Sequence, residues 1–402
     1  MKRIFLIPIL FLFFAAGCDD SSKILKQNEI EPSQILLEGS NEIIPSQENT
    51  TKLWFEHGNR GLPNALSYDF HDMFTTEKSR LVNALRGMDY FMLRLNLYDS
   101  IRHEFFRDSI APMLIAHNVP LVIDVGSAVW LECRCEQQRV NILNRDISLI
   151  RRIKNTGVDV KYVALQSILS KPVPPQLEES CETGETCDYT LGERVADALR
   201  YAYKVDYEFD GEIGIGILDA LVVKGSHGEN QLGFNYRTAY TALDRAFKLK
   251  DIKLAFIVFD HPEEYLYSLS SWDRLLEAQR YVSDTIKTDV GILFTSSESK
   301  DHDSFRSTVL AFMDEFINRG GKMDHAVLAY WYKEIDNDIP QLRTIIEMAE
   351  RLYGDSFYEK CTDESYLEQR PDVAQDSYYG TKPDQHFVDH GRFEGMSKPS
   401  LD

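Results

Sequence analysis

Leu254-Ala255-Phe256-Ile257-Val258-Phe259-Asp260 is a continuous apolar run that ends at the carboxylate of Asp260. Seven other short apolar runs recur along the chain. Each run is short and is dominated by apolar, β-branched or aromatic side chains. Short continuous runs are typical of strands that are covered on both faces, as in parallel sheets. The other seven runs are residues 53–55, 90–95, 120–124, 160–165, 213–218, 290–294 and 325–330.

Helical patterns lie between these runs and after the last one, with apolar residues recurring at i, i+3 and i+4. Thr190 and Glu193 have the spacing of a capping box, and Asp338 followed by Pro340 predicts the start of the final helix. Two examples of the apolar spacing are Val195, Ala198, Leu199 and Ala202, and Leu310, Met313, Phe316 and Ile317. Eight strand-then-helix units in one unbroken series predict an α/β fold, a (β/α)8 TIM barrel. A doubly wound open sheet is the alternative.

The beginning of the chain has the pattern of an export signal. Lys2 and Arg3 precede an apolar run at residues 4–14, and Ala15-Ala16-Gly17-Cys18 supplies small residues before a cysteine. The run is too short for a bilayer core of about 30 Å, which needs roughly 20 residues. We expect a lipoprotein signal peptide at residues 1–17 and an exported protein held on a cell-envelope membrane, on its periplasmic or surface face, by lipid on Cys18. An ordinary secretory signal with an incidental cysteine is the alternative.

Composition divides the remaining chain into three parts. Residues 18–51 are polar and rich in Ser, Asn, Gln and Glu, which predicts a lipidated N-terminus and a flexible tether. Residues 52–355 hold the repeating units of the predicted barrel. Residues 356–402 are predicted to form a small helical module, and the stretch 366–396 resembles modules appended to bacterial glycosyltransferases and other exopolysaccharide-associated proteins. A stabilising helical hairpin is the alternative for this last part.

The chain is acidic, with a formal net charge of −20 that becomes −22 when the predicted signal peptide removes Lys2 and Arg3. Such a surface repels nucleic acid, whose binding depends on contacts from Lys and Arg to phosphate. Nucleic acid is therefore not an expected partner. Hydrophobic residues make up 43% of the 402 residues, which is enough for a large packed core.

Four cysteines fall in predicted loops and fit an oxidising compartment. They are Cys133, Cys135, Cys181 and Cys187. We expect disulfides that join these loops, although four cysteines allow three pairings and the sequence does not choose among them. A zinc site is the weaker alternative, because C-x-C and C-x5-C lack the usual knuckle spacing. Cys361 is left over.

In such a barrel the active site forms at the carboxyl ends of the strands, where the βα loops gather. Polar residues just past each strand are therefore the candidates. The catalytic candidates are Asp124, Asp219, Asp260 and Glu298, with Glu298 as the possible nucleophile, and the substrate-binding candidates are Glu56, Arg94, Asn96, Trp331 and Tyr332. This set suits a saccharide, because aromatic rings stack on pyranose rings and carboxylates accept hydroxyl hydrogen bonds or transfer protons.

Several candidates also have a purely structural interpretation. Asp260 precedes His261-Pro262 and can simply cap a turn, and Glu56 and Glu298 can be solvated loop acids. His57 and His261 lack H-x-H or H-E-x-x-H spacing. No metal site and no cofactor are therefore predicted.

Residues 52–353 resemble a poorly characterised group of bacterial TIM-barrel proteins related to glycoside hydrolases. Phe259-Asp260-His261-Pro262 resembles the group's sixth strand, and residues 320–327 followed by Trp331 resemble its eighth. The resemblance implies a glycosidase-type barrel. The group tends to carry Asp-Glu-Pro after strand four and Asp-Ile-Glu-Pro after strand five, where this chain has Gln166-Ser167-Ile168 and Ile217-Leu218-Asp219-Ala220. Because neither Gln166 nor Ser167 donates a proton at a useful pKa, the usual hydrolytic pair is expected to be incomplete.

Three functions fit these observations. The first is a lipid-anchored envelope protein that acts on a cell-surface or extracellular polysaccharide, with Asp260 and Asp219 or Asp124 sharing the acid and base roles. The second is a glycan-binding protein without turnover, which uses Trp331, Tyr332 and Arg94 at the mouth of a degenerate barrel. The third is a component of a protein assembly whose acidic face meets another protein.

Overall fold

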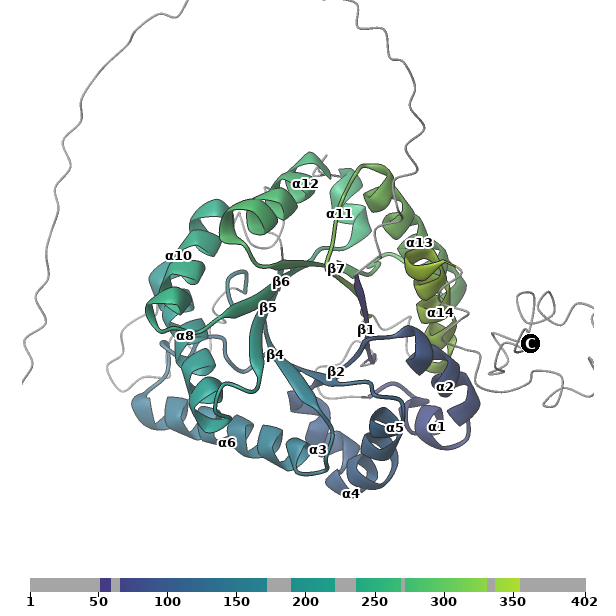
Figure 1. Cartoon of the computed structure of the whole chain (residues 1–402), viewed down its shortest axis with the longest axis horizontal. Helices are drawn as coiled ribbons and strands as arrows, with labels where there is room; N and C mark the ends of the chain where they lie inside the picture. Colours follow the sequence, from purple (N-terminus) through teal and green to yellow (C-terminus); the bar gives the residue numbers. More distant parts are fainter. Residues whose placement is uncertain are drawn as a thin grey trace, which may run out of the picture. The chain divides into compact units, whose positions relative to one another are not determined.

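The computed structural model describes residues 51–58, 66–171, 189–220, 236–268, 272–330 and 337–354. Eight strands form one closed barrel in chain order, each parallel to its neighbours, and the last strand pairs with the first (Figure 1). The predicted (β/α)8 TIM barrel is confirmed, and the open-sheet alternative is wrong. The strands are β1 (Lys52–Glu56), β2 (Tyr90–Arg94), β3 (Leu121–Val125), β4 (Val160–Gln166), β5 (Gly214–Ala220), β6 (Leu254–Asp260), β7 (Asp289–Phe294) and β8 (His325–Leu328).

Helices surround the barrel as an outer layer, in which α14 packs against both α13 and α2 and so closes the ring (Figure 1). The helices are α1 (Phe70–Thr75), α2 (Lys78–Gly87), α3 (Tyr98–Ile101), α4 (His103–Phe105), α5 (Ala111–Ala116), α6 (Glu136–Lys154), α8 (Leu191–Glu208), α10 (Tyr236–Leu249), α11 (Glu263–Ser268), α12 (Trp272–Tyr281), α13 (His302–Asn318) and α14 (Ile339–Tyr353). Shorter turns are η1 (Leu95–Leu97), η2 (Phe106–Ile110) and η3 (Val282–Ile286). Within the described ranges, none of the helices combines the length and apolar character that crossing a membrane requires.

The predicted strands and helix starts agree closely with the structure. β6 occupies the predicted run 254–260, whereas β8 ends two residues before its predicted run does. The capping box at the start of α8 is present, since Thr190 accepts from the Glu193 N–H and the Glu193 carboxylate accepts from the Thr190 N–H. The helical spacing of Leu310, Met313, Phe316 and Ile317 is confirmed in α13, where the first three side chains are buried and Ile317 is 43% exposed.

Helix α14 begins directly after Asp338, as predicted, but the Asp338 side chain does not cap it. Asp69 performs that role by accepting the N–H groups of Asp338 and Ile339 at 2.6 and 3.0 Å. The buried carboxylate of Asp338 accepts instead from the Gly58 N–H at 2.8 Å and from the hydroxyls of Ser67 and Tyr330. Asp338 therefore ties the loop after β1 and the residues after β8 to the start of α14.

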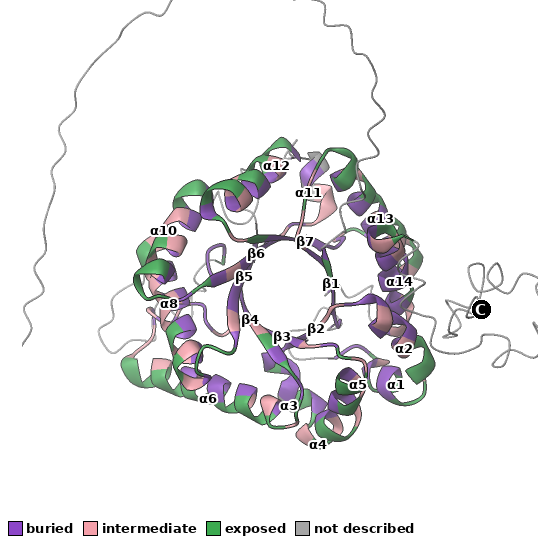
Figure 2. Cartoon of the chain, viewed as in Figure 1, coloured by how far each residue is buried: buried purple, intermediate pink, exposed green. Residues whose placement is uncertain are grey.

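Apolar side chains pack on both sides of the barrel sheet, as the continuous runs predict, and the strands are largely buried (Figure 2). One core fills the space between strands and helices, and a second fills the barrel interior. In the interior, the Phe256 ring lies 5.0 Å from the Trp54 ring and takes the place of a side chain at Gly216. A Cβ at Gly216 would lie 2.1 Å from the Phe256 ring, so this close approach requires glycine.

Candidate functional site

Strand alternation brings six polar side chains to the carboxyl end of the barrel interior. Side chains two positions apart on a strand point to the same side of the sheet. One residue of each strand lies in the interior core, namely Trp54, Met92, Val122, Ala164, Leu218, Val258, Leu293 and Val327. The residues two positions further on are Glu56, Arg94, Asp124, Gln166, Ala220, Asp260, Thr295 and Ala329, and we call this ring the mouth layer.

Arg94 joins the carboxylates of the mouth layer into one unit. Its Nε donates to Glu56 Oε1 and lies 3.7 Å from Asp124 Oδ2. Glu56, Asp124 and Arg94 are 0%, 2% and 7% exposed, so these charges are out of bulk solvent. Burial disfavours the charge on Arg94, but the nearby Glu56, Asp124 and Asp260 outweigh it and raise the pKa of Arg94. We call Glu56, Asp124 and Asp260 around Arg94 the acid cluster.

Burial raises the pKa of every carboxyl in the acid cluster. For Glu56 it outweighs the opposing effect of Arg94, and for Asp124 the charge of Glu56 adds to it. Burial, followed by the charges of Glu56 and Asp219, raises the pKa of Asp260 from 3.8 to about 7. Asp260 therefore changes its protonation near neutral pH, which is the property required of a general acid or base.

Two carboxylate oxygens of the acid cluster, Glu56 Oε2 and Asp124 Oδ1, are buried and have no hydrogen-bond partner among the described residues. Buried polar atoms in proteins are almost always paired, and an exception needs a specific explanation. Both oxygens belong to the mouth layer, where a ligand hydroxyl could donate to them. The arrangement can thus accept hydrogen bonds from a polyhydroxylated ligand and exchange a proton with it.

Asp219 lies on the opposite side of its strand from the mouth layer, because the neighbouring Leu218 faces the interior. Its carboxylate accepts from the Leu169 N–H, and the Ser170 side chain also hydrogen-bonds to it. Burial raises the pKa of Asp219 to about 6, while these hydrogen bonds and Arg194 oppose the shift. The structure therefore gives Asp219 a role in holding the loop after β4, and its acid–base role stays a prediction.

Two other candidates are exposed. Asn96 lies in η1 with its side chain exposed, and Glu298 is exposed in the loop after β7. Glu298 lines a cavity of about 380 Å³ that Glu264 and Ser296 also line, and its N–H donates to Glu264 Oε1 at 3.1 Å. The nucleophile role of Glu298 stays a prediction.

His57 and His261 are buried next to the mouth layer. Burial lowers the pKa of His57 to about 3 and that of His261 to about 4, so both rings are neutral at pH 7. His57 Nδ1 lies 3.1 Å from the Gly58 carbonyl oxygen, and its ring packs against Phe70 at 5.0 Å. In the part of the chain that the structure describes, no group of three or more His, Cys, Asp or Glu side chains could hold a metal ion.

Several predicted residues lie outside the described ranges. These are Cys18, Trp331, Tyr332, Cys181, Cys187 and Cys361, together with the C-terminal module. Cys133 is buried in the loop after β3, and Cys135 precedes α6. The disulfide pairing therefore stays a prediction.

The loop after β3 carries a residue that sequence reasoning missed. Trp130 has a φ of +64°, which is rare for a bulky side chain and costs about 1–3 kcal/mol. Its N–H donates to the Tyr189 hydroxyl at 2.9 Å, and the next two N–H groups, of Leu131 and Glu132, donate to Asp197 at 2.7 and 2.8 Å. Because Tyr189 also donates to Asp197, three successive backbone groups are fixed by one buried pair. No sequence signal marks this arrangement.

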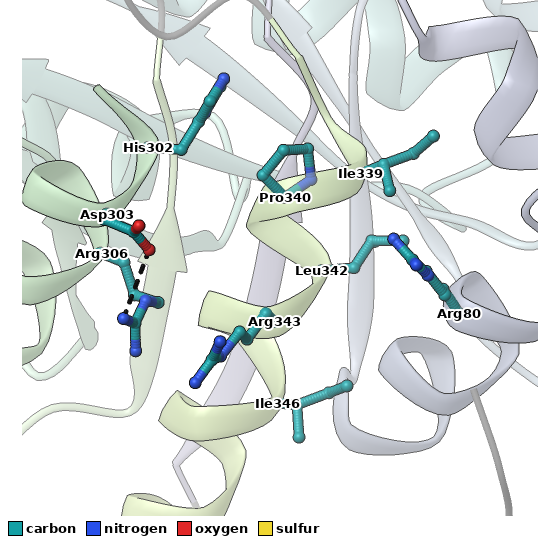
Figure 3. Close-up of a pocket in the computed structure, with 9 residues that line it drawn as sticks. All are labelled: Arg80, His302, Asp303, Arg306, Ile339, Pro340, Leu342, Arg343 and Ile346. Carbon is teal, nitrogen blue, oxygen red and sulfur yellow. Dashed lines mark hydrogen bonds and ion pairs between the residues drawn. The ribbon is translucent and has the colours of Figure 1, made fainter. Parts of the chain in front are cut away.

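A separate cavity of about 270 Å³ lies in the outer layer, over the start of α14. In Figure 3, Arg80 of α2 and Arg306 of α13 lie on opposite sides of this helix, with Pro340 and Arg343 between them. Arg306 and Arg343 both pair with Glu347, at 3.1 and 3.0 Å. The lining residues belong to outer helices, so this cavity is not part of the mouth layer.

No model of a protein family matches this sequence, and neither does a curated protein. Among solved structures the chain is similar to a 3-keto-D-glucoside 4-epimerase from E. coli, with 12% identity and a TM-score of 0.44 over 75% of this chain and 99% of that chain. It is also similar to a D-psicose 3-epimerase, with 12% identity and a TM-score of 0.40 over 76% and 98% of the two chains. A GH18 chitinase from Pseudoalteromonas aurantia has 9% identity and a TM-score of 0.39 over 74% and 100%. All three names describe sugar-processing proteins, and the likeness to this chain concerns the fold alone.

Proposed function

We propose that this chain is a lipid-anchored envelope protein that acts on a cell-surface or extracellular polysaccharide at the mouth of its barrel. The observation that carries the proposal is the acid cluster, in which the buried carboxyls of Glu56 and Asp124 and the half-buried carboxyl of Asp260 lie near Arg94, and two oxygens lack a partner among the described residues. Sugar hydroxyls are donors of the kind that these oxygens need.

Asp260 is the group we assign to proton transfer. Its pKa of about 7 lets it hold a proton near neutral pH, and hydrolysis of a glycosidic bond needs an acid that protonates the leaving oxygen. Asp124 or Glu56 would then remain to assist as the partner carboxylate. Arg94 stabilises the ionised form of that partner through its ion pairs.

Binding without turnover is the second candidate, and Gln166 is the observation that favours it. Gln166 occupies the mouth layer at the end of β4, where the resembled group tends to carry an acid. An amide cannot replace a carboxyl as proton donor. In this alternative the acid cluster and Arg94 hold the sugar hydroxyls, and no bond is broken.

The anchoring part of the proposal depends on Cys18. The variant Cys18→Ser lacks the acyl chains, so it should appear in the soluble fraction after cell breakage. The wild-type chain should stay with the membranes. Mass spectrometry of the wild-type N-terminus should find a lipid-modified cysteine. A Cys18→Ser chain that still sediments with membranes would contradict the anchor.

Retention of the protein on insoluble polysaccharides tests the saccharide part of the proposal. We expect the full chain to be retained on at least one polymer from a panel of peptidoglycan, cellulose, chitin and the exopolysaccharide of the producing bacterium, and soluble fragments of that polymer should release it. The control Glu104→Gln, at an exposed carboxylate of α4 outside the mouth layer, should be retained equally. If no polymer retains the chain and none is cleaved, the protein-assembly alternative is favoured.

A further inference from the structure

Trp130 is a partly exposed aromatic residue that the fold holds in an unusual backbone conformation. It follows β3, so it lies in a loop at the same end of the barrel as the acid cluster. The Tyr189–Asp197 pair fixes the backbone of this loop, which keeps Trp130 in its left-handed conformation. A strained residue that the surrounding structure enforces is a pointer to function.

Lys171 links Trp130 to the acid cluster. This exposed residue follows β4, and its Nζ lies over the indole ring of Trp130, 5.1 Å from the ring centroid. The same ammonium group partly offsets the burial that raises the pKa of Asp124. The Lys171 ammonium thus lies over an aromatic face and also acts electrostatically on a buried carboxyl of the mouth layer.

The indole nitrogen adds an independent observation. Trp130 Nε1 is buried and has no hydrogen-bond partner among the described residues. Indole N–H groups usually find a partner when they are buried. Trp130 therefore combines an aromatic face under the Lys171 ammonium with a buried donor that has no partner among the described residues, at the same end of the barrel as the unpaired oxygen of Asp124.

We propose that Trp130 and Lys171 form a sugar-binding subsite beside the acid cluster, in which a pyranose ring replaces the Lys171 ammonium on the indole face. Aromatic faces attract both cations and the C–H faces of sugars, so one can substitute for the other. The displaced ammonium then donates to hydroxyls of the bound sugar. This subsite rests on the proposed function and adds to it the residues that position the saccharide.

The test uses the full chain labelled with 5-fluorotryptophan, whose four indoles give separate ¹⁹F resonances. Trp130→Phe identifies the Trp130 signal, and Trp272, which is buried in the outer layer, serves as the internal control. Soluble oligosaccharides from the four polymers of the retention panel are the probes. We expect the Trp130 resonance to shift on titration while the Trp272 resonance stays in place. Lys171→Met should shift the Trp130 resonance without any ligand.

The oligosaccharide affinities of two Trp130 variants distinguish a loss of stacking from a loss of folding. Trp130→Leu should weaken oligosaccharide binding about tenfold, whereas Trp130→Phe should stay within about threefold, because it keeps an aromatic face. An unchanged Trp272 resonance in Trp130→Leu shows that the fold is kept. If an oligosaccharide binds but neither the Trp130 resonance nor the Trp130→Leu affinity changes, the subsite is wrong and the proposed function stands. If no polymer or oligosaccharide binds at all, both are wrong.

Discussion

Replacing Arg94 with Met should lower the free energy of unfolding by about 3–5 kcal/mol at pH 7. Arg94 is the cation that contacts Glu56 and Asp124 inside the mouth layer, and Met keeps most of its volume without the charge. Removing one partner from a buried ion pair leaves the other charge uncompensated, which is why the loss is large. Urea denaturation followed by circular dichroism measures it.

The loss of stability caused by Arg94→Met should depend on pH. Arg94 lowers the pKa of Glu56 and Asp124, so without it both folded-state values rise further above those of the unfolded chain. The native state then holds more protons than the unfolded state, and stability falls as the pH rises. The difference in unfolding free energy between the wild type and Arg94→Met should therefore shrink toward pH 4 and grow above it. Arg107→Met, at an exposed ion pair with Asp108, is the matched control and should leave unfolding unchanged. Equal stability of the two variants at pH 7 would contradict the described acid cluster.

Asp260→Asn should lower the rate of polysaccharide cleavage by about 10²–10⁴-fold while the polymer is still bound. The amide keeps the shape of the carboxyl but transfers no proton at neutral pH.

The free energy of unfolding should increase in the same variant at alkaline pH. The wild-type pKa is raised from 3.8 to about 7, so wild-type stability falls as the pH rises from about 4 to 7. Without that ionisation, Asp260→Asn should be about 1–3 kcal/mol more stable than wild type at pH 8.

Glu104→Gln is the control for both effects, because its carboxylate is exposed in α4, outside the mouth layer. It should change neither the cleavage rate nor the stability at pH 8. A variant Asp260→Asn that is less stable than wild type at pH 8 would show that the carboxylate is ionised and well paired in the folded protein. That result would remove the reason for assigning proton transfer to Asp260.

The fold could be predicted from the sequence because its signal is local. A strand of this barrel is buried on both faces, so it appears as a continuous apolar run, and the run at 254–260 coincides with β6. The limits of β8 were less clear, because Ala329 and Tyr330 are buried beyond the last paired residue and extend the apolar pattern past the strand. Helix starts followed local rules at Thr190, whereas at Asp338 the capping oxygen came from Asp69, far away in the sequence.

The site could be predicted only in part, because it depends on which side of a strand a residue faces. Asp219 and Asp260 both lie at the ends of strands, but only Asp260 is two positions beyond an interior residue. A shift of one position reverses the side, and the sequence does not fix the register to that accuracy. Trp130 was missed for a different reason, since its position depends on the distant residues Tyr189 and Asp197.

The central claim, that the acid cluster acts on a saccharide, is tested most directly by product release. The full chain, Asp260→Asn and Glu104→Gln are each incubated with the polymer that retains them, and released oligosaccharides are measured by size exclusion and mass spectrometry. We predict products from the wild type and from Glu104→Gln, and none from Asp260→Asn although it remains bound. Release by Asp260→Asn at the wild-type rate, or a wild-type chain that neither binds nor cleaves any polymer of the panel, would contradict the claim.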